Sequence, residues 1–426
     1  MGIKILAVGD LHIGRLPSRL PESLKARALD FSPARAWEQT VELACSEGVH
    51  AVVLAGDVVE SDRDFFEALP RLQAGIEKLT EAGIRILAVT GNHDVQVLPK
   101  LAARIPSFEL LGEGGEWQSV TLQADKAESL TLWGWSFPAA QVRSSPLADF
   151  PGRLGSEPAI GVLHCDRDQS DSPYAPVTSG ELRAAGLDGW LLGHIHQPDD
   201  LGPQNPAGYL GSVVGLDAGE AGQRGPWLLE WDGGVLKRFS QMPLGPIRWQ
   251  RLTVDLAGVT EPTQVASRFA DAMDQLSMEL DERGDRSQLI AIRLTLTGET
   301  TLSNDALLDA MPEAEQTRHL SGHTERAWFI ERYRIEAKPY TPLEEIARRD
   351  DQPGLLAKRL LTLEQNDGDP ARERLIDEAM QVAEHTLSDG GWRDLPGERP
   401  TREQVAGWLQ ARGQDALRAM LAGEQD

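Results

Sequence analysis

Four short apolar runs, each followed at once by polar residues, constrain the fold of this chain more than any other feature. They occupy residues 4–8, 51–55, 86–90 and 159–163. Nearly continuous β-branched and aliphatic runs of this length are typical of strands buried on both faces. Helices are expected between them, one from Ser32 and Pro33 to Gly48 and another over residues 63–82 that stops at Gly83. Strands that alternate with helices predict a layered α/β domain.

A further apolar segment has a different period. Residues 130–137 alternate between apolar and other side chains, which places Trp133, Trp135 and Phe137 on one face of a strand. This alternation predicts that antiparallel strands join the parallel ones. Aromatic side chains can stack on nucleic-acid bases, but the alternation favours packing in the core.

The pattern changes near residue 243, so we divide the chain into three parts. Residues 1–242 form the α/β domain. Residues 243–339 predict a small α+β domain, with strands over 247–256, 288–297 and 327–337 and a helix over 262–283. Residues 340–426 predict a helical tail with short apolar stripes. Isolated helices under about 12–15 residues are marginal in water, so the tail is expected to bind a partner; packing on this protein's own domains is the alternative.

Composition limits the classes of partner. The chain has 426 residues, 42 Lys and Arg against 66 Asp and Glu, and a net charge of −24. No global field draws such a protein to nucleic acid, so phosphate binding needs a local feature such as a metal centre. The two cysteines fit a reducing compartment. With no signal peptide before Gly9 and no apolar run of about 18 residues, we expect a cytoplasmic protein without a membrane span.

Possible metal ligands follow every predicted parallel strand. Carboxyl ends of such strands meet at one edge of a sheet, so these side chains are expected to converge. Carboxylate, imidazole and amide oxygen suit manganese, iron or zinc, and a pair of ions about 3.5–4 Å apart needs a bridging ligand, for which Asp57 is the candidate. His194 and His196 flank Ile195 and project to the same side. The set comprises Asp10, His12, Asp57, Asn92, His93, Asp94, His164, His194 and His196.

The order of these motifs resembles the calcineurin-like metallophosphoesterases. The motifs are Gly9-Asp10-Leu11-His12, Gly56-Asp57, Gly91-Asn92-His93-Asp94, Leu163-His164 and Gly193-His194-Ile195-His196. The first and last of them, the chain length, and residues 210–217 with Glu220 are similar, more narrowly, to the SbcD-type DNA-repair exonucleases. The resemblance implies a layered β-sandwich flanked by helices, with an α+β cap domain and a helical tail.

The same resemblance implies two divalent cations, with Mn²⁺ expected. Asp10, His12, Asp57 and His196 would surround one ion, and Asp57, Asn92, His164 and His194 the other. His93 would be a proton donor whose ring Asp94 holds. A metal-bridged hydroxide would attack phosphorus in line, and His93 would protonate the departing alkoxide. One departure from the family pattern is Glu60, which stands where a second aspartate is usual.

A small basic cluster follows the first motif. Arg15 and Arg19 lie in the loop after His12. They are candidates for contacts with a phosphate backbone, although a solvated loop explains them as well.

The leading functional hypothesis is a manganese-dependent DNA exonuclease or phosphodiesterase. It would act in double-strand-break or DNA-end processing as a homodimer, with its tail bound to an SMC-like ATPase of the SbcC type. One alternative is a small-substrate phosphodiesterase or phosphatase; Asp94 after His93 disfavours protein phosphatases, and the long C-terminal half disfavours cyclic-nucleotide phosphodiesterases. Another is a scaffold subunit of the ATPase complex, which the intact ligand set disfavours.

Overall fold

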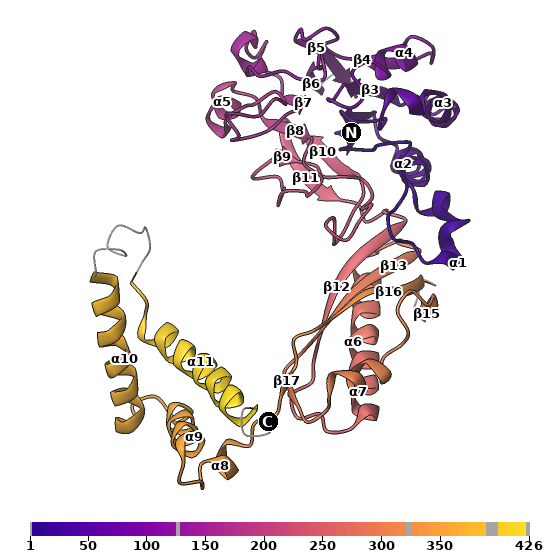
Figure 1. The fold of residues 1–426 in the computed structure, drawn as a ribbon. Coiled ribbons are helices and arrows are strands. Elements are labelled where there is room, and N and C mark those ends of the chain that lie inside the picture. Colours follow the sequence, from indigo (N-terminus) through magenta and orange to yellow (C-terminus); the bar gives the residue numbers. More distant parts are fainter. Residues whose placement is uncertain (1, 125–127, 321–325, 389–398, 423–426) are drawn as a thin grey trace. The chain divides into compact units, whose positions relative to one another are not determined.

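The computed structural model describes residues 2–124, 128–320, 326–388 and 399–422 (Figure 1). The chain divides into two compact units. The larger comprises residues up to 256 together with 261–298 and 304–336, and the smaller comprises 257–260, 299–303 and the chain from 337 onward.

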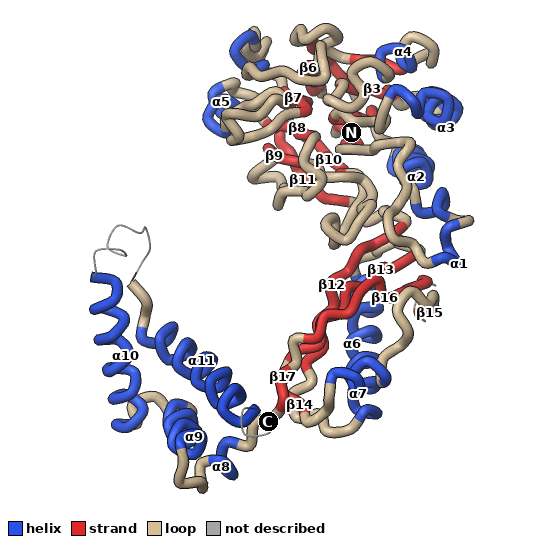
Figure 2. The backbone as a smooth tube through the Cα atoms, viewed as in Figure 1, coloured by secondary structure: helices blue, strands red, loops and turns tan. Residues whose placement is uncertain are grey.

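The first sheet of the larger unit has six strands in the order β11-β10-β1-β2-β3-β4. Figure 2 shows the strands in red among the helices and loops. Its centre is parallel, as the apolar runs predict. These strands are β1 (Ile3–Val8), β2 (Ala51–Ala55), β3 (Arg85–Val89) and β4 (Phe108–Leu110). The hairpin of β10 (Trp227–Asp232) and β11 (Val235–Gln241) adds two antiparallel strands.

The second sheet has five strands in sequence order. They are β5 (Gln118–Gln123), β6 (Ser129–Trp135), β7 (Ala159–His164), β8 (Gly189–Gly193) and β9 (Ala207–Tyr209). Only β5 runs antiparallel to its neighbour. A shared apolar cluster joins the sheets, with Ile5, Val53 and Leu87 from the first and Ile160 and Leu191 from the second. This α/β sandwich confirms the predicted fold class.

Helices cover the outer faces of the sandwich. The longer ones, α2 (Pro33–Glu47) and α3 (Phe65–Glu81), bury Trp37 and Ile76 against the first sheet. Gly48 ends α2 with a φ of 60°, but the Ser32 hydroxyl donates to the Leu29 carbonyl and does not cap the helix. The shorter elements are α1 (Glu22–Lys25), η1 (Ala28–Phe31), η2 (Asp62–Asp64), α4 (Leu98–Ala102), η3 (Pro146–Asp149) and α5 (Ser179–Ala184).

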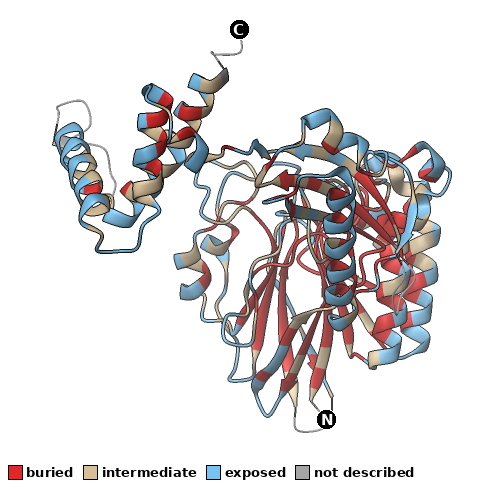
Figure 3. Cartoon of the chain, turned by 90° about the horizontal axis from the view of Figure 1, so that it is seen from below, coloured by how far each residue is buried: buried red, intermediate tan, exposed pale blue. Residues whose placement is uncertain are grey.

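The aromatic residues of the alternating segment lie in the interior, as predicted. Trp135 and Phe137 share a buried cluster with Trp190, and Trp133 is also buried. Figure 3 shows the buried residues concentrated along the strands. These side chains are therefore core residues and not a base-stacking surface.

The middle region of the chain adds a third sheet to the larger unit. Strands β12 (Ile247–Asp255), β13 (Leu289–Thr297) and β16 (Arg326–Ile335) are parallel, and β15 (Arg318–Leu320) pairs antiparallel with β16. Helix α6 (Pro262–Glu282) packs on one face, where Phe269 meets Trp328, and α7 (Asn304–Asp309) lies beside α6. At the start of β12, Ile247 and Trp249 join the apolar core formed by the first sheet and its helices.

The smaller unit is mainly helical, as predicted for the tail. It contains α8 (Leu343–Ile346), α9 (Gln352–Leu363), α10 (Pro370–Ser388) and α11 (Arg402–Ala422), with the short strand pair β14 (Glu299–Thr300) and β17 (Lys338–Pro339). Ile346, Ala357, Leu360 and Leu417 form its small core. Among the described residues of the whole chain, none of the helices combines the length and the apolar character that crossing a membrane requires.

Candidate metal centre

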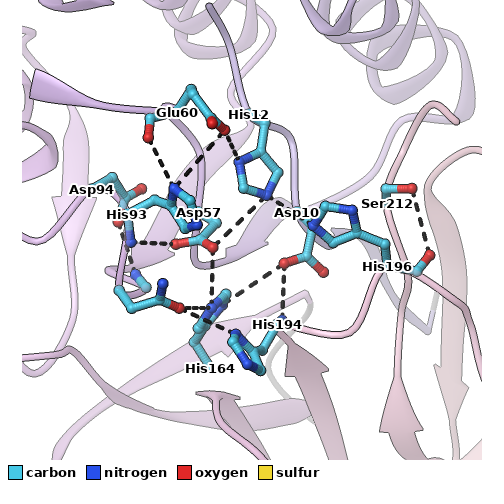
Figure 4. A network of polar contacts seen from close by, with 12 residues as sticks. Asp10, His12, Asp57, Glu60, His93, Asp94, His164, His194, His196 and Ser212 are labelled. Carbon is cyan, nitrogen blue, oxygen red and sulfur yellow. Dashed lines mark hydrogen bonds and ion pairs between the residues drawn. The ribbon is translucent and has the colours of Figure 1, made fainter. Parts of the chain in front are cut away.

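The polar side chains that follow five strands converge at one end of the sandwich (Figure 4). The loops after β1, β2 and β3 reach this point from the first sheet. The carboxyl ends of β7 and β8 reach it from the second. The side chains that meet there are those of Asp10, His12, Asp57, Asn92, His93, His164, His194 and His196.

Several non-glycine residues of this site have an unusual backbone conformation. Asp10, His12, Asp57 and His194 all have a positive φ, at 39°, 51°, 48° and 101°. Such conformations are uncommon outside glycine and cluster at functional sites. Gly91 makes room for one of these residues, because a Cβ there would lie 2.1 Å from Asp57 Oδ1.

One group of ligand atoms comes from Asp10, His12 and His196. The Nε2 atoms of the two histidines lie 3.1 Å apart. The Oδ1 atom of Asp10 accepts a hydrogen bond from the His194 N–H, whereas its Oδ2 atom is buried and has no hydrogen-bond partner among the described residues.

A second group comes from Asp57, His164 and His194, and Asn92 completes it. Asp57 Oδ2 lies 3.3 Å from His164 Nε2 and 3.8 Å from His12 Nε2, so it lies between the two groups. Asn92 Oδ1 lies 3.1 Å from His164 Nε2 and 3.1 Å from His194 Nδ1.

Each of the four ligand imidazoles has one nitrogen that faces the centre, and a hydrogen-bonding or charged partner on the second nitrogen orients the ring. His12 Nδ1 lies 2.7 Å from Glu60 Oε2, and His196 Nδ1 lies 2.6 Å from Glu220 Oε1. His164 Nδ1 faces the Ala55 carbonyl at 3.1 Å, and His194 Nε2 lies 3.3 Å from Asp166 Oδ1. Partners of this kind select the tautomer of metal-binding histidines and set their basicity.

Two of these orienting residues were not assigned a role from the sequence. Glu220 lay in the segment that resembles the exonucleases, and its Oε2 also accepts from Ser212 and from the Leu216 N–H. Asp166 stands two residues after His164, which is the only signal the sequence offers. Glu60, noted as a departure, holds His12 with its longer side chain.

Asp94 differs from what the family resemblance implies. Its carboxylate accepts hydrogen bonds from the backbone N–H groups of Gly91 and Val58, at 2.8 and 2.7 Å. The His93 ring instead places Nδ1 3.1 Å from the Glu60 carbonyl oxygen. Asp94 is fully buried and joins the loops that carry Asp57 and His93, so it positions the loops and does not hold the ring.

Burial and neighbouring charges shift the pKa values of two carboxylates at the centre. Burial is the largest single effect and would raise the pKa of Asp57, but the charge and hydrogen bond of His164, together with the charges of His12 and His93, lower that pKa well below its usual range. Burial, together with the charge of Asp57, raises the pKa of Asp94 to about 7. The site thus stabilises an ionised Asp57 by surrounding it with positive charge.

The two arginines proposed for substrate binding lie at the edge of the site and beyond it. Arg15 Nε lies 3.9 Å from Glu60 Oε2. Arg19 Nη1 donates to Glu331 Oε1 in the middle region at 2.7 Å, so its guanidinium already has a partner.

The residues fit a centre of divalent cations. The donor set combines carboxylate, imidazole and amide oxygen without thiolate, and the buried Asp10 Oδ2 lacks a partner. A cation would provide one. The two groups of ligand atoms flank Asp57, which suits a dinuclear site.

The importance of the orienting carboxylates leads to a prediction. Glu220→Gln is expected to weaken metal binding roughly 10- to 100-fold, because the neutral amide holds the His196 imidazole less firmly. Calorimetric titration with Mn²⁺ would measure the change. The exposed Glu113→Gln serves as the control, and an unchanged affinity in the Glu220 variant would contradict the role given to this carboxylate.

Comparisons with known proteins agree with this geometry. Residues 3–198 match the family described as calcineurin-like phosphoesterase, and residues 249–338 match the middle domain of the metallophosphoesterase YhaO. The uncharacterized metallophosphoesterase YhaO of Bacillus subtilis is 26% identical over 284 residues, which cover 66% of this chain and 67% of that protein.

A second kind of relative has a more specific description. The DNA double-strand break repair protein Mre11 of Aeropyrum pernix is 37% identical over 274 residues, which cover 59% of this chain and 64% of that protein. Mre11 of Haloferax volcanii is 35% identical, over 60% of this chain and 55% of that protein. The alignments thus span less than two thirds of these Mre11 relatives. Together, the match over residues 3–198, the five motifs and the ligand geometry identify this part of the chain as similar to the calcineurin-like phosphoesterases.

Proposed function

We propose that this protein is a manganese-dependent phosphodiesterase that hydrolyses DNA as an exonuclease and acts in the processing of DNA ends. The observation that carries the proposal is the convergence of two ligand groups on Asp57 beside the exposed His93. The description of the Mre11 relatives as DNA double-strand break repair proteins supports DNA as the substrate.

The residues of the chain divide the chemistry among them. Divalent cations bound by the two ligand groups would supply Lewis acidity toward a phosphoryl oxygen and lower the pKa of water. The His93 side chain is 42% exposed, and its Nδ1 faces the Glu60 carbonyl oxygen. That contact orients the ring, so Nε2 is the atom that donates a proton to the departing alkoxide. Asp57 Oδ1 accepts a hydrogen bond from the backbone N–H of His93 at 3.0 Å, so the residue that donates the proton is held beside a metal ligand.

Removal and replacement of the metal tests the proposal. Dialysis against a chelator is expected to abolish hydrolysis of bis-p-nitrophenyl phosphate and of a labelled DNA oligonucleotide, and Mn²⁺ is expected to restore both. Mg²⁺ alone should restore little, because it rarely accepts imidazole-rich sites. Hydrolysis of the small diester without degradation of DNA would favour a small-substrate phosphodiesterase. Absence of both activities with Mn²⁺ bound would favour a scaffold subunit.

We also propose that the protein is a homodimer and that its tail binds an SMC-like ATPase of the SbcC type. Helices α9, α10 and α11 enclose an apolar groove of about 650 Å³, lined by Leu356, Leu363, Leu375, Val382 and Trp408 among others. Val382 and Trp408 are 67% and 56% exposed. A groove of this kind suits an amphipathic helix of a partner.

Two charged substitutions test the tail proposal. Val382→Asp with Trp408→Asp is expected to abolish co-purification with a co-expressed ATPase of this type, because buried unpaired carboxylates oppose docking. Hydrolysis of the small diester should not change. Met278→Asp, at a 64% exposed position on α6, is the matched control. Co-purification that survives the double substitution would remove the groove as the binding site.

A further inference from the structure

A band of arginines crosses the open face of the middle sheet. Parallel pairing places Arg251 of β12 opposite Arg293 of β13, and Arg293 opposite Arg332 of β16. Partners in register point to the same face of a sheet. The next row on this face comprises Thr253, Thr295 and Arg334. We call these six residues the arginine band.

The band lies on the face that α6 leaves open. The Trp328 ring of β16 contacts Phe269 of α6, so the residues of the strands in register with Trp328 face α6. Figure 1 shows α6 along one face of this sheet. Arg251, Thr253, Arg332 and Arg334 are exposed, and Arg293 and Thr295 are half-buried. The guanidinium groups of Arg251 and Arg332 have no ion-pair partner among the residues that the structure describes.

The band is joined to the catalytic part of the molecule by direct contacts. Trp249 lies two residues before Arg251, and its Nε1 donates to the carbonyl of Gly215, in the loop that leads to Glu220. Glu331 accepts from Arg293 at 2.7 Å and from Arg19, which lies in the loop after His12. The band therefore begins about 7 Å along the strand from that loop contact.

Folding alone does not explain this arrangement. Like charges directly opposite each other on a sheet are destabilising. Glu331 pairs with Arg293 and Glu336 with Arg334. Asp217 also acts on Arg293, and Asp255 lies in the row beyond. The chain has an excess of 24 acidic charges, so a row of arginines in register is an exception to its composition.

We propose that the arginine band binds the sugar-phosphate backbone of a nucleic-acid strand that extends beyond the metal centre. This proposal rests on the proposed nuclease function and adds a binding surface for the substrate. Three strands about 4.8 Å apart give a row about 10 Å long. A strand with one charge per 3.4 Å of rise places about three phosphates along it. Guanidinium groups bind phosphate in a bidentate manner, and the threonine hydroxyls are further donors.

The composition of the band also predicts the mode of recognition. Its six residues include no aromatic side chain on which a base could stack. Backbone contacts fix register and orientation without reading bases. Binding through this face is therefore independent of sequence and sensitive to salt.

The test measures oligonucleotide binding by Arg251→Gln with Arg332→Gln, the two arginines of the band whose guanidinium groups form no ion pair within the described part of the chain. Fluorescence anisotropy of a labelled oligonucleotide in EDTA, which prevents cleavage, is expected to show binding about 10- to 30-fold weaker at 0.1 M salt. For a single strand, the slope of log K against log salt should fall in magnitude by about 1.4, since two phosphate contacts are lost. Single-stranded and duplex probes of equal length show which form binds.

Two further variants make the result specific. Arg268→Gln with Arg283→Gln removes the same charge from the α6 side of the domain, at exposed positions, and should leave binding unchanged. Arg251→Lys with Arg332→Lys keeps the charge and should retain most of the affinity. The thermal midpoint of the glutamine variant should equal or exceed that of the wild type, because like-charge repulsion is relieved.

The possible outcomes separate failure of the arginine band from failure of the proposed nuclease function. Equal weakening by the α6-side control, or unchanged binding in the band variant, would overturn the arginine band while the nuclease proposal stands. A wild-type protein that hydrolyses the small diester but binds no oligonucleotide would overturn both. Loss of affinity for an acidic protein, with oligonucleotide binding intact, would assign the band to a protein partner instead.

Discussion

Asp57→Asn is expected to remove metal-dependent hydrolysis almost completely, by about 10⁴-fold or more. The Asp57 side chain is 3% exposed, and its Oδ2 lies 3.3 Å from His164 Nε2 in one group of ligand atoms and 3.8 Å from His12 Nε2 in the other. Asparagine removes the one negative charge that serves both groups. Cations supply several kcal/mol of transition-state stabilisation, and about 5.4 kcal/mol corresponds to about 10⁴ in rate.

Metal content and activity should fall together in this variant. Mass spectrometry of the dialysed protein, loaded with Mn²⁺, is expected to find fewer than two ions per chain. Mn²⁺ should raise the thermal midpoint of the wild type more than that of the variant, since only binding to the folded state stabilises it. The exposed Asp200→Asn is the control. Two tightly bound ions together with near-normal turnover would show that Asp57 is not a shared ligand.

His93→Asn should produce a different defect, in which turnover of a DNA substrate falls about 10²–10⁴-fold while both ions stay bound. A ring nitrogen of His93 lies within 4.8 Å of ligand atoms of His12 and Glu60. Its Nδ1 nevertheless faces the Glu60 carbonyl oxygen and the side chain is 42% exposed, so we assign the ring as a proton donor and not as a ligand. The variant therefore loses a proton donor and keeps the centre.

The leaving group gives this prediction its sharpest test. A p-nitrophenolate leaves without protonation, whereas a DNA alkoxide needs a proton. The loss should thus be much smaller on bis-p-nitrophenyl phosphate than on an oligonucleotide, with His319→Asn, an exposed histidine of β15, as control. Equal losses on both substrates, or loss of metal, would contradict the proton-donor role.

The assignment of Asp94 shows where resemblance exceeded what the residues themselves support. The position after His93 suggested a carboxylate that holds the ring. In the structure, this buried carboxylate accepts hydrogen bonds from the backbone N–H groups of Gly91 and Val58. The physical reason is that these backbone N–H groups would otherwise be buried without a hydrogen-bond acceptor.

The tail illustrates a second limit. Its helices were predictable from apolar periodicity, because that signal is local. The association of residues 257–260 and 299–303 with the same unit was not. It depends on contacts such as that of Arg418 with Glu299, which lie far apart in the chain.

By itself, the sequence determined the α/β class, the positions of the parallel strands and the types of ligand that follow them. These are local properties, since hydrophobic periodicity and the residue after a strand can be read within a few positions. The tertiary structure alone decided which groups orient the ligands, for example Glu220 beside His196 and Asp166 beside His194. It also decided the register of the arginine band, which depends on an irregularity after Ile292 in the pairing of β13 with β16. Packing of whole sheets sets such contacts and such a register. These contacts join residues far apart in the chain, 184 positions for His12 and His196 and 312 positions for Arg19 and Glu331.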